Sequence, residues 1–452
     1  MNENKKTLIF LGAAVVLLIL ALITSPGRIT PEAFLDQGEL FFPDFTDPNT
    51  ATTLEVIDFD EATGVARPFK VTFKKNAWTI PSHHDYPADA GQQLAKTAAS
   101  IIELKKDEFR TDNVSDHEAC GVIDPFDETA GGAGRGQRVT VRDGAGAVLA
   151  DFIVGRPVET RSGFRYVRVS GQNRVYAVNM PMEISTRFED WIDTDLLRLE
   201  KYKIERVILN DYSVNERTLS VDTRDNLVLT RTGTSWTANN MAKDEKVDST
   251  LMQSLLTSLD VLSIVGVRPK PEGLSASLKV AETKRELTQG DLMSLQDKGF
   301  YLSREGQLLS NEGEMQVYTA DGVYYTLRFG EVVYGSGLAL TAGVQDERGQ
   351  ETDRSKENRY LFITAEFNEG YFRQPPEPRD KSFLDKPDSL LSDADRRNKR
   401  MQDEYDEWLR KVETGRQTAA QLSERFADWY YVISGDSYDK IRLTRSSMVV
   451  KK

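Results

Sequence analysis

Three histidines and one cysteine are the residues of this sequence best suited to metal binding or nucleophilic catalysis. His83 and His84 are followed by Asp85 and by Asp89, and imidazole and carboxylate groups are ordinary metal ligands. Neighbouring side chains on an extended segment point to opposite sides, which makes joint ligation of one ion awkward. We therefore interpret this group as a solvated loop and predict no metal site.

The cysteine, Cys120, lies three positions after His117, a spacing that could pair a nucleophile with a base. A reactive thiolate needs positive surroundings, whereas the residues around this cysteine are acidic: Asp116, Glu118, Asp124 and Asp127. We predict a half-buried structural cysteine. Because it is the only cysteine, no intrachain disulfide can form.

Two further segments resemble catalytic motifs but lack the residues that complete them. Residues 131–136, Gly-Gly-Ala-Gly-Arg-Gly, have no following Lys-Ser/Thr and no apolar strand leading into them, so we predict a flexible hairpin connection. Residues 434–437, Ser-Gly-Asp-Ser, lack the flanking glycine of a nucleophile elbow. Paired acids could act as hydrolytic carboxylates, although their strand or turn context favours solvated faces: Asp58 with Asp60, and Asp193 with Asp195.

Four tryptophans recur at matched positions along the chain, which core packing explains more simply than ligand stacking: Trp78, Trp191, Trp236 and Trp429. With no complete motif left, we predict no catalytic residue, no cofactor and no metal. The sequence indicates a protein that is not an enzyme.

The elements around these residues form a pattern that occurs twice. Alternating segments at 54–59 and 68–73 predict strands, residues 76–80 predict a short strand with Trp78, and a helix is expected over 88–106. Hairpins are expected at 137–154 and 164–178, followed by a short helix ending at Trp191.

The same order returns after residue 203. Strands are predicted at 204–209, 219–221 and 227–230, then around Trp236, and a helix over 247–265. Strands at 315–318, 324–329 and 358–363 match the hairpins of the first copy, and residues 425–429 repeat the pattern of 187–191. We predict an α+β fold of two tandem repeated units of antiparallel strands plus a packed helix, preceded by one transmembrane helix.

The second copy carries two additions. A polar insertion is expected to form a mobile loop at 335–357, and a Pro-rich linker at 374–378 leads into a charged helix over 389–412, which we expect Gly415 to interrupt. The helix places Tyr405, Trp408 and Leu409 on one stripe, a possible partner surface. The alternative is that the stripe covers a face of its own unit.

Length and charge set the outer limits. A chain of 452 residues suffices for two or three domains, and a net charge of −13 disfavours binding to nucleic acid. The predicted domains are a cytoplasmic tip and transmembrane anchor (1–30), a first unit (31–199), a second unit (200–372), and a linker, charged helix and closing segment (373–452).

An apolar run at residues 8–24 follows Lys5 and Lys6 and would span about 26 Å as a helix, enough for a thin membrane. Bulky Ile23 and Pro26 make a poor cleavage site, so a retained signal anchor is favoured over a cleaved signal. The lysines predict a cytoplasmic N-terminus, with the bulk of the chain periplasmic or extracytoplasmic on a single-pass inner-membrane anchor.

The Trp strand and its helix, the Phe-Ile-Val-Gly hairpin at 152–155, Arg-Tyr-Val-Arg at 165–168 and the segment 426–433 together resemble the bacterial family called domain of unknown function 4340. The likeness covers most of the chain beyond residue 50. It implies an N-terminal membrane anchor and companionship with ABC-type export systems related to gliding-motility transporters, hence a partner rather than a reaction.

We therefore predict a binding or scaffold subunit of an ABC-type envelope transport assembly, whose partners are the membrane proteins of that assembly. A stand-alone binder of an envelope polymer such as a polysaccharide is the second interpretation, and an envelope hydrolase is the third.

Overall fold

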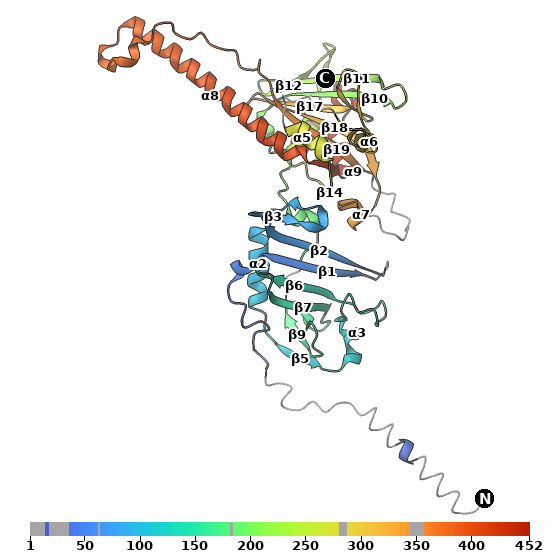
Figure 1. The fold of residues 1–452 in the computed structure, drawn as a ribbon. Helices are drawn as coiled ribbons and strands as arrows, with labels where there is room; N and C mark the ends of the chain where they lie inside the picture. Colours follow the sequence, from blue (N-terminus) through green and yellow to red (C-terminus); the bar gives the residue numbers. More distant parts are fainter. Residues whose placement is uncertain are drawn as a thin grey trace, which may run out of the picture. The chain divides into compact units, whose positions relative to one another are not determined.

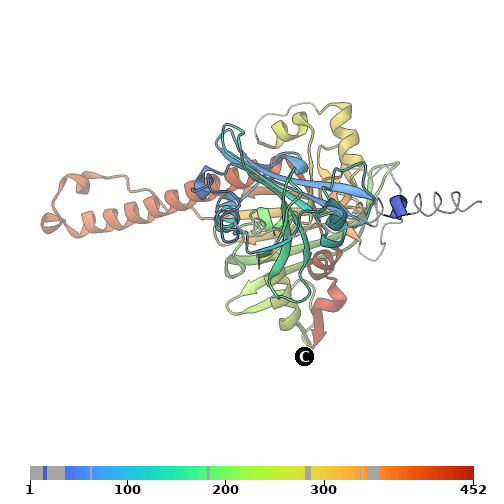
Figure 2. The same cartoon turned by 90° about the horizontal axis from the view of Figure 1, so that it is seen from below.

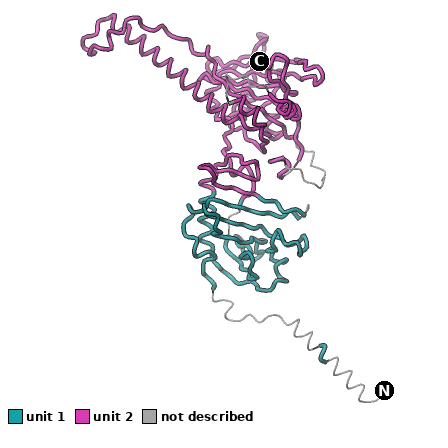
Figure 3. The backbone as a smooth tube through the Cα atoms, viewed as in Figure 1, with its two compact units in different colours: residues 1–68, 94–184 teal, residues 69–93, 185–452 magenta. Residues whose placement is uncertain are grey.

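The computed structural model describes residues 14–17, 36–61, 64–180, 184–279, 287–335, 337–343 and 357–452. The chain divides into two compact units (Figure 3): unit 1 comprises residues 1–68 and 94–184, and unit 2 comprises residues 69–93 and 185–452. Most of the expected anchor at 8–24 lies outside the described residues, where only 14–17 are placed, as helix. No helix within the described ranges is both long and apolar enough to cross a membrane.

The fold mixes helices with two large antiparallel sheets (Figure 1). The first sheet has nine strands in the order β4-β3-β2-β1-β6-β7-β8-β9-β5. Its strands are β1 (Thr53–Asp60), β2 (Val65–Lys74), β3 (Ala77–Ile80), β4 (Tyr86–Pro87), β5 (Glu108–Thr111), β6 (Gln137–Arg142), β7 (Val148–Pro157), β8 (Phe164–Val169) and β9 (Val175–Asn179). The strands predicted between residues 54 and 178 are thus present within a few residues of their expected bounds.

The helix predicted over 88–106 is shorter in the structure, because hydrogen bonds to other segments keep the residues at both ends out of the helix. Helix α2 spans Gly91–Ile102 and buries Leu94, Thr97, Ala98 and Ile101, at helical spacing. Before it, the amide of Ala88 donates to the Trp78 carbonyl, which keeps this segment extended. After it, the Leu104 carbonyl accepts from the Phe41 amide, which draws the chain away from the helix axis.

The second sheet has eight strands in the order β12-β11-β10-β17-β18-β19-β20-β14. They are β10 (Ile204–Asn215), β11 (Ser220–Thr232), β12 (Ser235–Ala238), β14 (Gly266–Pro269), β17 (Glu314–Thr319), β18 (Val323–Val333), β19 (Asn358–Phe367) and β20 (Trp429–Ile433). The two strands predicted at 219–221 and 227–230 are one strand, β11, because it pairs with β10 from Ser220 to Thr230 across a bulge at Asp211/Tyr212.

Smaller elements complete unit 2. Two short pairs join β13 (Glu245–Val247) to β21 (Val449–Lys451) and β15 (Phe300–Leu302) to β16 (Leu308–Ser310). The helices are α4 (Ser249–Asp260), α5 (Glu272–Lys279), α6 (Gln289–Gln296), α7 (Gly337–Thr341), α8 (Asp393–Ala427), α9 (Gly435–Ile441) and α10 (Arg445–Met448). Helix α4 replaces the expected helix over 247–265 and begins where the Asp248 side chain accepts from the amides of Thr250 and Leu251.

The two large sheets share one order of elements. In each, a meander of three strands (extended by β4 in the first sheet) is followed by a helix, the next strand lies at the far edge, and the last strands fill the space between. Residues 187–191 and 425–429 have similar sequences but do not form the same element in the two units. Phe188–Trp191 is a 3-10 helix after β9, whereas residues 425–429 end α8 and begin β20.

Helix α8 is continuous, and the expected break at Gly415 was wrong. Gly415 is buried in α8, and a Cβ atom there would lie 2.3 Å from Cε2 of Phe367 and 2.9 Å from the Asp321 carbonyl oxygen. The glycine therefore permits close packing of the helix on β19 and does not end it. The N-terminal part of α8 extends away from the second sheet with the chain before it alongside (Figures 1 and 2).

Candidate functional site

The sequence predicts that His83 lies in a solvated loop, and this was wrong, because the side chain is buried. It is 2% exposed and stacks on Phe188, with ring centroids 4.5 Å apart. Its Nε2 lies 2.8 Å from the Thr341 hydroxyl, and its Nδ1 lies 3.0 Å from the Ser82 hydroxyl. Burial lowers the pKa of His83 to about 4, so the ring is neutral at ordinary pH and its two nitrogens pair with hydroxyl groups.

His84 is exposed and extends the same contact, because its Nε2–H donates to the Ala342 carbonyl over 2.6 Å. Together the histidines hold the end of α7, the described part of the polar insertion; its residues 344–356 lie outside the described residues. Arg268 holds the other side, donating to the carbonyls of Ala339 and Leu340 over 2.9 Å each. No group of three or more His, Cys, Asp or Glu side chains suited to a metal ion occurs in the described part of the chain.

Cys120 is a buried structural residue. It is 3% exposed and packs with Val122, Ile153 and Val175, and burial raises the pKa of its thiol. His117 is buried as well, with Nε2 2.8 Å from the Asn173 carbonyl. This contact engages the imidazole in holding a loop.

The glycine-rich segment 131–136 is built around its arginine. The Arg135 guanidinium donates to five backbone carbonyls at 2.6–3.3 Å and lies 4.6 Å from the Phe59 ring centroid. The accepting carbonyls belong to Asp124, Pro125, Asp127, Ala130 and Gly131. The segment is thus a connection whose arginine binds carbonyl groups of the preceding loop, residues 124–131.

The remaining motif residues have structural partners. Ser434 caps α9 by accepting from the Ser437 amide. Asp60 pairs with Arg67 at 2.5 Å, and Asp193 pairs with both Arg198 and Arg425 at 3.1 Å. Asp58 accepts from the Gln137 amide nitrogen at 2.8 Å, and Asp195 accepts from the Arg198 backbone amide at 2.8 Å.

The tryptophans differ in burial more than the sequence suggested. Trp191 is fully buried and donates to the Ser185 carbonyl. Trp78, Trp236 and Trp429 are only partly buried. Trp78 and Trp236 lie on the short third strand of each meander, near the sheet edge, where less of the protein covers them.

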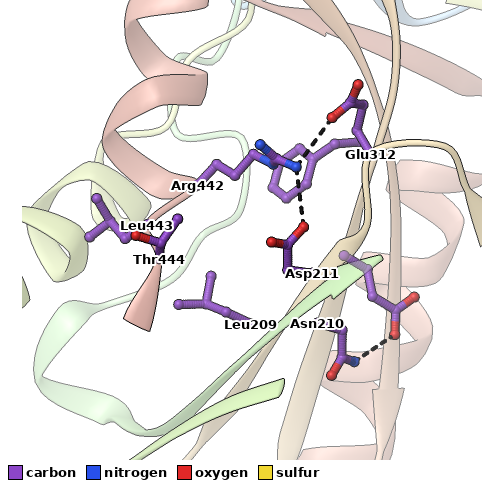
Figure 4. Close-up of a pocket in the computed structure, with 9 residues that line it drawn as sticks. Leu209, Asn210, Asp211, Glu312, Arg442, Leu443 and Thr444 are labelled. Atoms are coloured by element: carbon purple, nitrogen blue, oxygen red, sulfur yellow. Dashed lines mark hydrogen bonds and ion pairs between the residues drawn. The ribbon is translucent and has the colours of Figure 1, made fainter. Parts of the chain in front are cut away.

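An ion network that the sequence analysis missed lies between α9 and the second sheet (Figure 4). Arg442 pairs with Asp211 at 3.3 Å and with Glu312 at 3.2 Å, beside a cavity of about 20 Å³, room for roughly one water molecule. Tyr438 lies beside it with the Arg359 guanidinium 4.5 Å from its ring centroid, and burial raises the pKa of Tyr438 to about 12. Opposite charges and close packing suit this network to joining elements.

A second missed feature is a buried lysine, Lys270, packed against β19 of the second sheet. The Lys270 ammonium donates to the Phe426 carbonyl over 2.9 Å and lies 3.9 Å from the Phe362 ring centroid. Burial lowers the pKa of Lys270 well below its ordinary value. The cation is thus held by a carbonyl and an aromatic face, which ties α8 to the edge strand β14.

The structure brings Tyr405 and Trp408 together with the linker that returns beside α8. Their ring centroids are 5.3 Å apart, and the Trp408 indole N–H donates to the Phe372 carbonyl over 3.2 Å. Both side chains are half-buried, whereas Leu409 is 47% exposed. Part of the predicted partner stripe is therefore occupied by the chain itself, and Leu409 remains at the surface.

We call residues 373–411 the arm. Its outer end is organised by a capping box, in which the Ser392 hydroxyl accepts from the Asp395 amide and the Asp395 carboxylate accepts from the Ser392 amide. Asp395 also pairs with Lys386 at 2.9 Å, and Phe383 of the 3-10 helix η7 (Ser382–Asp385) is buried against the arm. The arm is an ordered hairpin of unit 2.

Comparison with known proteins gives one match. Residues 78–277 match the family model described as Domain of unknown function (DUF4340), from Trp78 in β3 to Ser277 in α5. No curated protein and no solved structure was found to match the chain. The resemblance seen in the sequence is thereby confirmed over residues 78–277, which are similar to the DUF4340 domain family.

Proposed function

We propose that this protein is a membrane-anchored, extracytoplasmic binding or scaffold subunit of an ABC-type envelope transport assembly, and that it performs no catalysis. The anchor is the apolar run at residues 8–24, which the two preceding lysines orient with the N-terminus in the cytoplasm. Resemblance to the family supports the transport partner.

The two large sheets are, in this proposal, tandem copies of one ancestral unit. The support is that their strand orders correspond apart from the edge strand β4, which has no counterpart in the second sheet, with α2 and α4 at the same point in each order. A duplicated unit closes two similar cores, so structure present in only one copy calls for a separate explanation.

The arm is such a structure, and it is the observation that carries the proposal. Apart from Asp395, the buried residues of α8 begin at Val412, so the helix before that point adds little to the core of the second sheet. Ordering each residue of this hairpin costs roughly 1–2 kcal/mol of backbone entropy. A surface for a partner explains that cost, whereas stability of the sheet does not.

Removing the arm tests the proposal. Residues 374–409 can be replaced by a short Gly-Ser linker, because Phe372 and Trp408 are hydrogen-bonded neighbours and the gap is small. We expect the shortened chain to keep its unfolding transition, since Val412 and the buried residues after it remain, and to lose at least tenfold in copurification with membrane proteins of the assembly.

An intact-arm variant, Asp403→Asn with Glu407→Gln, is the control and should copurify like the wild type. Copurification of the arm deletion at wild-type yield would show that the arm is not the partner surface.

A second candidate function, binding of an envelope polymer such as a polysaccharide, is favoured by one observation. Phe73 is 40% exposed and lies 5.2 Å, between ring centroids, from the partly buried Trp78. Aromatic rings can stack on sugars, and the corresponding pair in the second sheet is Arg231 with Trp236. The wild-type protein would then cosediment with isolated wall or glycan material, and Phe73→Ala would abolish this cosedimentation.

A further inference from the structure

The outer end of the arm exposes leucines. We define the arm tip as residues 381–400, which hold η7, the 3-10 helix η8 (Asp388–Leu390) and the first two turns of α8. Leu384 is 64% exposed and Leu390 is 72% exposed, whereas Phe383 and Leu391 are 5% and 9% exposed. The fold of the tip thus uses two of its four large apolar side chains and leaves two in solvent.

The same tip exposes arginines. Arg396 and Arg397 are exposed in the second turn of α8, and neither forms an ion pair with any residue that the structure describes. The lysines nearby are paired instead, Lys386 with Asp395 at 2.9 Å and Lys399 with Asp388 at 2.6 Å. The arginine charges are therefore available to an outside group.

The balance of charge at the tip differs from that of the whole chain. Residues 381–400 contain six basic and four acidic side chains, in a protein of net charge −13. Two of the acids are in the ion pairs just named, and the others are Asp385 and Asp393. Asp393 lies in the first turn of α8, where the helix dipole offsets its charge.

The position of the tip keeps these groups clear of the sheet. Val412, the first buried apolar residue of α8, lies nineteen positions after Asp393, which corresponds to about 28 Å of helix. Figures 1 and 2 both show this part of α8 extending beyond the second sheet. The tip can therefore meet a flat surface without interference from the rest of unit 2.

We propose that the arm tip docks on a lipid bilayer that carries anionic headgroups. Exposed leucines fit the boundary between headgroups and acyl chains, and the exposed arginines six and seven positions after Leu390 fit the phosphates above it. A protein groove would be matched by a continuous apolar stripe, whereas the leucines here are separated along a turn and flanked by charge. The contact is weak and reversible, and it adds a second attachment to the anchored chain.

A fluorescent label at the tip tests this directly in the full chain. Ser389 is exposed, so Ser389→Cys can carry an environment-sensitive dye, while Cys120 is buried and should not react. The labelled chain is placed in phosphatidylcholine vesicles with or without phosphatidylglycerol and with nitroxide quenchers on the acyl chains. It is also placed in neutral nanodiscs to which vesicles with quencher are added. The first arrangement detects a tip that docks on the bilayer holding the chain, and the second detects a tip that docks on a separate bilayer.

We expect quenching and a blue shift of the dye with phosphatidylglycerol and little change without it. Near an anionic surface each arginine contributes about fivefold in partitioning, so Arg396→Gln with Arg397→Gln should weaken the response about 25-fold, and added salt should weaken it for the wild type. Leu384→Asn with Leu390→Asn should abolish the quenching by acyl-chain nitroxides.

Two matched controls separate docking at the tip from general charge effects. Arg410→Gln with Lys411→Gln removes two exposed cations from the body of the arm and should leave the response unchanged. A dye at Asp403→Cys should not be quenched.

Absence of quenching at residue 389 in both lipid arrangements, or equal quenching at residue 403, overturns the proposal. A response that requires membrane proteins and is lost after their proteolysis overturns it as well. Copurification of the assembly is measured separately, so failure of either proposal is seen without the other.

Discussion

Gly415 provides a sharp test of how α8 packs. In an exposed helix interior, replacing glycine with alanine stabilises by about 1 kcal/mol, because alanine has less backbone freedom to lose on folding. At position 415 the new methyl group would lie 2.3 and 2.6 Å from two ring carbons of Phe367 and 2.9 Å from the Asp321 carbonyl oxygen. Overpacking of this kind costs typically 1–3 kcal/mol.

The upper half of that range applies here, because the clash involves a backbone oxygen and a ring confined by Phe372, 6.4 Å away between centroids. Subtracting the helix-propensity gain, we expect Gly415→Ala to lower the free energy of unfolding by about 1–2 kcal/mol. Urea unfolding followed by tryptophan fluorescence reports on the correct region, since all five tryptophans belong to unit 2.

The matched control is Gly290→Ala in α6. There the nearest atom to a new Cβ is the Thr288 hydroxyl oxygen at 3.7 Å, an ordinary contact. The same substitution should therefore stabilise, by about 0.5 kcal/mol near a helix end. If Gly415→Ala is as stable as the wild type, or if both variants shift in the same direction, α8 does not pack against β19 as described.

Two further predictions concern buried titratable groups. His83 has a pKa of about 4 in the folded state against 6.5 when unfolded, so its contribution to the free energy of unfolding is fully present above pH 6.5 and falls by about 3 kcal/mol as the pH drops through 4. Urea titrations of His83→Gln should lack this loss, and parallel curves of stability against pH for the two proteins would contradict the prediction. Burial lowers the pKa of Lys270 well below 10.5, so the stability of the wild type relative to Lys270→Met should rise as the pH approaches 10.5, and a difference independent of pH would show that the amine is solvated.

Local patterns in the sequence were sufficient for most strands and for the two amphipathic helices. Alternation predicts β17 and the start of β1, because buried and partly exposed residues take turns along them and that periodicity is local information. Helix ends were less accurate, because the limits of α2 depend on hydrogen bonds to Trp78 and Phe41, which are not neighbours in the sequence.

The misinterpretations share one physical cause, which is contact between distant parts of the chain. His83 looks solvated beside His84 and Asp85, yet its partners Phe188 and Thr341 lie 105 and 258 positions away. Gly415 looks like a helix breaker until Phe367 is placed against it. The same holds for Lys270, whose charge gave no reason to expect burial against the Phe362 ring and the Phe426 carbonyl.

The arm explains why the predicted stripe of Tyr405, Trp408 and Leu409 is only partly a surface. Trp408 fastens the returning linker through Phe372, and the Ser392–Asp395 box with Lys386 fastens its other end, so the hairpin is held from within. A surface ordered in advance does not lose further conformational entropy when a partner or a membrane meets it. The half-buried aromatic side chains therefore supply the rigidity of the arm, and exposed residues such as Leu409, Leu384 and Leu390 supply the contacts that remain to be made.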